Sequence, residues 1–130
     1  MSRRIILLLS GAAIVILGLV TSFAFHGIEG SSKYGAPIDT TKAQIVELAS
    51  LFANTQAYTG KKVIVDGQAG QVCQASGCWI TVTDGANQLF VQFYDFTVKL
   101  KPGIRVRVQG EVRTQNNAPY LVGQGVEIIR

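Results

Sequence analysis

The chain lacks most of the side chains with which enzymes carry out chemistry. Its single histidine is His26 and its single methionine is Met1. No G-x-S-x-G turn, phosphate-binding glycine loop or close pair of carboxylates occurs along it. The acidic residues Asp66, Asp84 and Asp95 are scattered rather than paired. We therefore expect a protein that is not an enzyme and that has no cofactor, and the sequence identifies no small-molecule substrate.

The chain also carries little net charge outside its N-terminal segment. The net charge is +4, but Arg3 and Arg4 precede a long apolar run at the N-terminus. Without these two, ten basic residues face eight acidic ones, which leaves a net charge of +2. So small an excess does not by itself attract a polyanion. We therefore expect no nucleic-acid partner.

Residues 5–25 contain no charged side chain and are almost wholly apolar. A helix of this length spans about 30 Å, the thickness of a hydrocarbon layer. Because Arg3 and Arg4 lie before the run, the positive-inside rule places the N-terminus in the cytoplasm. We predict a single-pass anchor over residues 1–25 in a bacterial inner membrane, with the rest of the chain in the periplasm. The alternative is a cleaved signal peptide, with a cut near Ala24 and a soluble periplasmic product.

Residues 26–38 are polar and contain glycine, which predicts a linker, and residues 39–130 are expected to form one domain. Asp39 and the Thr41/Gln44 spacing of a capping box predict the start of a short amphipathic helix that ends near Asn54. Its apolar face would carry Ile45, Leu48, Ala49 and Phe52.

From residue 61 onward the apolar period changes to two, which is typical of strands. Turn residues divide the segment into five strands at 61–73, 78–84, 87–96, 104–114 and 119–130. The pattern V-x-V-x-G occurs twice, at 63–67 and 106–110, with each glycine where a barrel strand bends. Five strands leave no unpaired, aggregation-prone edge if they close into a barrel. We therefore predict a mainly β domain with an OB-fold-like barrel. Another five-stranded barrel or a small sandwich is the alternative.

Two segments carry a family resemblance: YTGKKV at 58–63 and VCQASGCW at 72–79. With the C-Q-x-x-G-C-W motif, the region from about Tyr34 onward resembles the exported, uncharacterised DUF4920-type domain. That resemblance implies an OB fold and export, and it implies no reaction. The order of membrane helix and barrel is also similar to the haem chaperone of cytochrome c maturation. That family holds haem through a histidine near its C-terminal end, and this chain has none there.

Cys73 and Cys78 flank a four-residue loop between the first two strands, and a regular hairpin would bring them face to face. In an oxidising compartment we predict that they form a disulfide that fixes the hairpin. The alternatives are a reducible, redox-active disulfide and a two-thiolate site for Cu(I). Two thiolates do not complete a zinc site, so we expect no closed metal site within one chain.

In an OB fold, the loops between strands one and two and between strands four and five frame the usual ligand surface. Here these loops are residues 73–79 and 115–118. Alternation places Phe90, Tyr94 and Phe96 on one face of the third strand and Leu89, Val91 and Phe93 on the other. One of the two sets is therefore expected to be core and the other to need a covering. We assign the following residues to a binding surface: Gln74, Gly77, Trp79, Phe90, Tyr94, Phe96 and Tyr120.

Arg105, Arg107 and Arg113 lie on one face of the fourth strand, with Glu111 among them. Such a basic face either attracts anionic head groups or an acidic partner, or is simply solvated.

The sequence therefore favours a membrane-anchored, periplasmic, non-catalytic OB-fold module that docks on an envelope protein or membrane complex. The first alternative is a periplasmic copper or thiol-redox carrier that uses Cys73 and Cys78. The second is a single-strand nucleic-acid binder, because OB barrels often stack bases on aromatic side chains.

Overall fold

The computed structural model describes residues 32–129. The predicted membrane segment and residues 26–31 of the predicted linker lie outside these residues. Within residues 32–129, the helices are too short to cross a membrane. The elements in chain order are β1 (Lys33–Gly35), β2 (Gln44–Ile45), α2 (Leu48–Ala53), α3 (Thr55–Tyr58), β3 (Lys62–Val72), β4 (Trp79–Thr83), β5 (Gln88–Gln92), β6 (Arg105–Gln115) and β7 (Ala118–Ile128).

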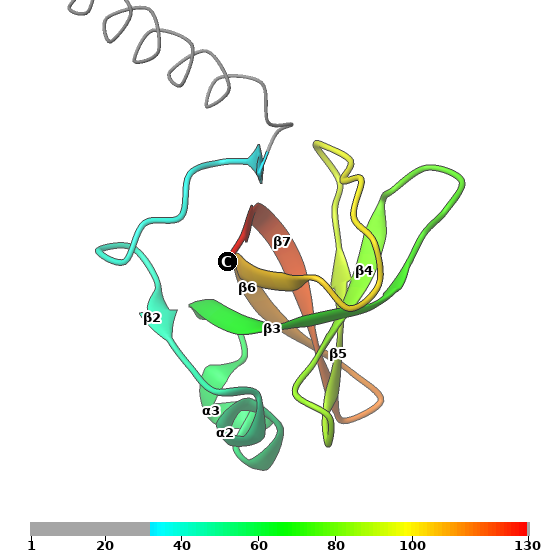
Figure 1. Cartoon of the computed structure of the whole chain (residues 1–130). Helices are drawn as coiled ribbons and strands as arrows, with labels where there is room; N and C mark the ends of the chain where they lie inside the picture. The colour runs from blue at the N-terminus through cyan, green and yellow to red at the C-terminus, as the bar shows by residue number, and fades with distance from the viewer. Residues whose placement is uncertain (1–31, 130) are drawn as a thin grey trace, which may run out of the picture. The chain divides into compact units, whose positions relative to one another are not determined.

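Five of the strands close into a barrel (Figure 1). Strands β3, β4 and β5 pair antiparallel in chain order, and β5 then pairs parallel to β7. Strand β6 pairs antiparallel with both β7 and β3, which closes the ring. This mixed five-stranded barrel confirms the predicted OB-fold-like architecture.

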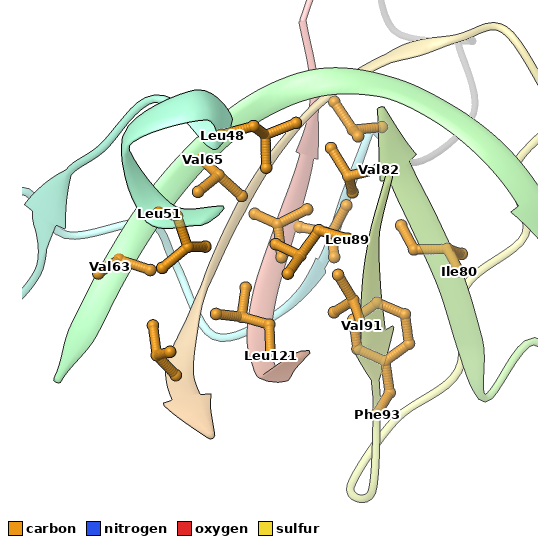
Figure 2. Close-up of a cluster of buried hydrophobic side chains, with 14 of the residues drawn as sticks. Leu48, Leu51, Val63, Val65, Ile80, Val82, Leu89, Val91, Phe93 and Leu121 are labelled. Atoms are coloured by element: carbon orange, nitrogen blue, oxygen red, sulfur yellow. The ribbon is translucent and has the colours of Figure 1, made fainter. Parts of the chain in front are cut away.

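The barrel interior is built from alternate residues of the strands, as a period of two requires. Figure 2 shows the buried side chains of β3, β4, β5 and β7 pointing toward one another. Several of them have no exposed surface at all: Val63, Val65, Ile80, Val82, Leu89, Val91 and Leu121. Burying each such side chain stabilises the fold by about 1.5–3 kcal/mol relative to exposure.

Gly110 lies where β6 bends, and this bend lets β6 pair with both β3 and β7. A Cβ added at this position would overlap the carbonyl oxygen of Val122 on β7. The register between β6 and β7 shifts at the same place, between Gln109 and Gly110. A glycine in a strand interior often marks such a bulge and close backbone approach, so the strand bend predicted at the second V-x-V-x-G motif is confirmed.

The predicted helix start at residues 39–41 is wrong. The Asp39 carboxylate accepts hydrogen bonds from the backbone N–H of Thr41 at 2.9 Å and from the Thr41 hydroxyl at 2.5 Å. These bonds make a turn and lower the pKa of Asp39, with the Thr41 hydroxyl as the largest cause. Gln44 then belongs to β2, which pairs parallel with β3, so no capping box forms.

The apolar face of the helical segment is also rotated from the predicted one. The segment is two short helices, α2 and α3, rather than one. Leu48 and Leu51 are buried in the core, whereas Ile45 is 61% exposed. Ile45 points outward because it lies in β2, where helical spacing does not apply.

Part of the predicted linker is strand. Residues Lys33–Gly35 form β1, which pairs antiparallel with β7, and Tyr34 lies opposite Val126. The Tyr34 hydroxyl donates a hydrogen bond to the carbonyl oxygen of Lys99 at 3.0 Å. The structured region therefore includes residues that precede the predicted domain start at 39.

We expect Leu51→Ala to destabilise the protein by about 2–5 kcal/mol, because it empties a fully buried position. Ile45→Ala is the matched control and should change the free energy of unfolding by less than about 0.5 kcal/mol, as exposed sites do. Urea unfolding of the full chain, followed by the fluorescence of the single tryptophan, measures both values. Equal losses for the two variants would contradict this assignment of the buried face.

Candidate functional site

Outward-facing residues of β4, β5 and β7, together with Tyr94 just after β5, form an aromatic face. We define the aromatic face as Trp79, Phe90, Tyr94 and Tyr120. Phe90 lies at its centre, because it is in register with Thr81 of β4 and with Tyr120 of β7. The face therefore lies across the second, third and fifth barrel strands, and OB folds bind ligands beside the second and third.

Two rings of this face are stacked on one another. The centroids of Trp79 and Phe90 are 5.5 Å apart, with an interplanar angle of 30°. Phe90 is 38% exposed and Tyr94 is 70% exposed, and the other large exposed hydrophobic residue within 32–129 is Ile45. A stacked pair beside an exposed tyrosine offers a rigid apolar contact at low entropic cost.

A groove of about 420 Å³ lies beside these rings, between the end of β5 and the β6–β7 hairpin. Asn116 and Asn117 turn that hairpin, both with positive φ, as the predicted turn requires. The groove lining consists of uncharged residues: Phe90, Gln92, Tyr94, Gln115, Asn116, Ala118, Pro119 and Tyr120. Gln92 is an additional lining residue that the sequence did not identify, although it shares the outward alternation of Phe90.

Phe96 does not share the exposed position of Phe90 and Tyr94. Strand β5 ends at Gln92, so alternation stops before Phe96 is reached. The chain then crosses to the loop after β3, where the Val98 N–H donates to the Gly77 carbonyl oxygen at 2.9 Å. Phe96 turns back and packs its ring 4.9 Å from that of Phe93, against the core.

A second groove, of about 660 Å³, lies between residues 35–42 and the bulged part of β6 and β7. Tyr94 lines this groove as well as the uncharged one. Its other lining residues include both signs of charge, from Asp39, Lys42 and Lys62. This groove therefore differs chemically from the neutral one.

Cys73 and Cys78 face each other across the loop, as the hairpin geometry predicts. Both are free thiols here, and their sulfur atoms are 3.8 Å apart. The Ser76 hydroxyl lies between them, at 3.2 Å from the Cys73 sulfur and 3.1 Å from the Cys78 sulfur. The predicted disulfide is not present in this structure, and oxidation of the pair stays a prediction.

The loop environment favours the thiolate form of Cys73. Its pKa is lowered to about 6, first by the Ser76 hydroxyl and then by the backbone N–H groups of Ser76, Cys78 and Gly77. The thiolate is the reactive form of cysteine, and donors of this kind stabilise it. Ser76 was not predicted as a site residue, because a loop has no periodicity to identify it.

Gly77 and Gln74, both assigned to the predicted surface, have different roles in the structure. Gly77 is buried with φ of 65°, and a Cβ there would overlap the carbonyl oxygen of Val98. It therefore lets the loop pack against residue 98, and it lines the same hollow as Cys73 and Gln74. Gln74 is exposed and lines a hollow of about 370 Å³ together with Cys73. Within residues 32–129, three or more metal-ligating side chains do not gather anywhere.

The three arginines of the predicted basic face lie on β6, and two of them are paired. Arg107 makes a bidentate pair with Asp66 at 2.7 and 2.9 Å, which raises the pKa of Arg107. Arg113 pairs with Glu111 at 2.9 Å. These ion pairs leave Arg105 as the main source of excess charge, so the face is close to neutral.

No model of a known protein family and no curated protein matches the chain. Among solved structures, its fold is similar to the hypothetical protein ygiW from E. coli. The TM-score is 0.53 and the identity 15%, and the match covers 78% of this chain and 100% of that one. A putative aspartyl-tRNA synthetase from Leishmania major Friedlin matches with a TM-score of 0.52 and 12% identity. That match covers 72% of this chain and 23% of the synthetase.

At these identities the likeness concerns the fold alone. The OB-fold part of the resemblance to the DUF4920-type domain is therefore confirmed, and no family model supports the narrower assignment.

The ring contact within the aromatic face is testable by a double-mutant cycle. We expect Trp79→Ala and Phe90→Ala to show a coupling of about 0.5–1.5 kcal/mol in unfolding free energy, as stacked pairs do. The control cycle replaces Trp79 and Tyr94, where we expect a coupling below about 0.5 kcal/mol. Because the cycles remove Trp79, circular dichroism during urea unfolding is the measurement. Equal coupling in both cycles would count against a specific stack.

Proposed function

We propose that this protein is a non-catalytic binding module of the bacterial envelope, held at the inner membrane by residues 5–25. Its aromatic face docks an extended, uncharged segment of a partner envelope protein. The observation that carries this proposal is Phe90, stacked on Trp79 and exposed beside a neutral groove.

The exposed rings support a protein partner. A monomeric protein leaves few large aromatic side chains exposed together, and aromatic residues are enriched at protein interfaces. Phe90 and Tyr94 line the 420 Å³ groove from one side, and Tyr120 contributes to its lining from β7. Such a groove accepts one apolar side chain of a docked segment as an anchor.

The groove chemistry supports an uncharged, hydrogen-bonding segment. The side-chain amides of Gln92, Gln115 and Asn116 line it, and each offers both donors and acceptors. A polypeptide backbone presents the complementary N–H and C=O groups. An anionic or cationic ligand would lose water in this groove without gaining an opposite charge.

The same chemistry disfavours the single-strand nucleic-acid alternative. Binding to a phosphate backbone draws most of its affinity from lysine and arginine. The groove has no charged lining residue, and Arg113, which lies opposite Tyr120 on β6, is paired with Glu111. The aromatic rings alone would give a weak contact with bases.

Site-specific photo-crosslinking in intact cells tests the docking. A photoreactive phenylalanine analogue at Phe90 should give one discrete protein adduct, which mass spectrometry identifies. The matched control carries the analogue at Gln68, an exposed, uncharged position of β3 outside the aromatic face. A peptide of the crosslinked sequence should then quench or shift the fluorescence of Trp79 in the purified full chain.

Tyr120→Ala should weaken binding of that peptide by roughly tenfold, as loss of an interface anchor does. The outcomes against the proposal are equal adducts at Phe90 and Gln68, adducts with lipid only, or saturable binding of a dT15 oligonucleotide at moderate salt.

The proposed membrane anchor is tested by measuring on which side of the inner membrane the C-terminus lies. A C-terminal epitope on the full chain should be digested by protease added to spheroplasts, and the chain should sediment with membranes in alkaline carbonate. A soluble chain that starts after Ala24 would support the cleaved form instead. An epitope protected until the inner membrane is broken would overturn the periplasmic assignment.

A further inference from the structure

Hydrogen bonds from other segments of the chain fix the Cys73–Cys78 loop, so its two thiols are positioned before any reaction. The Phe93 N–H and the Gln92 side-chain amide both donate to the Cys78 carbonyl oxygen, at 2.8 and 3.2 Å. The Val98 N–H donates to the neighbouring Gly77 carbonyl oxygen at 2.9 Å. These bonds anchor the loop to the end of β5 and to the chain that follows it, and they keep the two sulfur atoms in contact distance.

The two thiols differ in access. Cys73 lines the 370 Å³ hollow between the loop and residues 97–101, and Cys78 is not among its lining residues. Lys99 and Lys101 also line this hollow, and both are exposed. An anionic molecule entering the hollow would meet two cations and the sulfur of Cys73.

We propose that Cys73 and Cys78 form a thiol–disulfide exchange pair. In this pair Cys73 attacks the disulfide of an anionic, carboxylate-bearing molecule, and Cys78 resolves the mixed disulfide. The inference is independent of the docking function, because it rests on the loop and its hollow rather than on the aromatic face.

The exchange balances in two steps. The Cys73 thiolate attacks one sulfur of the incoming disulfide, which forms a mixed disulfide and releases the other half as a thiolate. Cys78 loses its proton to water and attacks the Cys73 sulfur, which releases the second half as a thiolate. Counted from two thiols, the pair loses two electrons and two protons, one when Cys73 becomes a thiolate and one from Cys78. The incoming disulfide gains the two electrons, and the two released thiolates become thiols when they take up protons from water.

Two other roles fit the geometry less well. A disulfide across so short a loop removes little chain entropy, and the hairpin is already closed by the Cys73 N–H bonded to the Trp79 carbonyl oxygen at 3.1 Å. Two sulfur atoms leave zinc incompletely coordinated, and within residues 32–129 no third ligand adjoins them. The low pKa of Cys73, by contrast, is the property that an attacking thiol needs.

Single-cysteine variants of the full chain in mild detergent test the assignment of roles. In Cys78→Ala, the rate of alkylation by iodoacetamide should rise with pH to a half-maximum near 6, the pKa of Cys73. In the matched variant Cys73→Ala, the remaining thiol should react roughly tenfold more slowly at pH 7, because it does not open into the hollow. Adding Ser76→Ala to Cys78→Ala should slow alkylation roughly fivefold at pH 6, since the thiolate loses its main hydrogen-bond donor.

Glutathione disulfide is the probe for exchange, because it is anionic and carries carboxylates. Cys78→Ala should accumulate one glutathione per chain on Cys73, whereas the wild type should convert fully to an internal disulfide and carry none. The double variant Lys99→Ala/Lys101→Ala should react more slowly with glutathione disulfide. The rate of that reaction should also no longer depend on ionic strength.

The proposal is overturned if the wild type retains glutathione, if excess reduced glutathione never reopens the oxidised pair, or if Cys73 alkylation has its half-maximum near pH 9. Protection of both thiols by stoichiometric Cu(I) at a glutathione excess would overturn it in favour of a metal carrier.

Discussion

Closure of the sheet by β6 is the constraint on which the rest of the molecule depends. Because β6 pairs with β3 on one side and β7 on the other, the five long strands have no free edge among them. Closure fixes which residues of every strand face inward, and the remaining residues must face outward. The exposed position of Phe90 and the buried position of Val91 are two results of the same closure.

The sequence predicted the strands well because their information is local. Alternation over residues such as Val63, Val65, Val106 and Val108 marks the core face without any knowledge of partners. The failures have long-range causes. Nothing local shows that Gln44 pairs with β3, or that the Val98 N–H reaches Gly77 and so ends β5 before Phe96. Asp39 predicts a helix start where the structure has a turn, because a side chain that caps a helix also stabilises an isolated turn.

The candidate sites were predictable to a similar degree. Loop position and alternation located Trp79, Phe90, Cys73 and Cys78, since an OB barrel places those loops and that face together. The donors that stabilise the Cys73 thiolate are not predictable from the sequence, because the direction of the Ser76 hydroxyl and of the backbone N–H groups depends on the loop conformation. The anchor, the disulfide and the partner stay predictions. The two sites are adjacent, because Gln92 lines the neutral groove and donates to Cys78.

The position of β7 has a consequence for how the protein forms. This strand pairs with β1, β5 and β6, and residues 118–128 are thus needed for the barrel to close. Without β7, strands β3, β4 and β5 can form only an open sheet with an unpaired edge. A fold dominated by contacts between distant segments also closes slowly. The incomplete barrel is therefore most prone to aggregation until β7 has paired with β5 and β6.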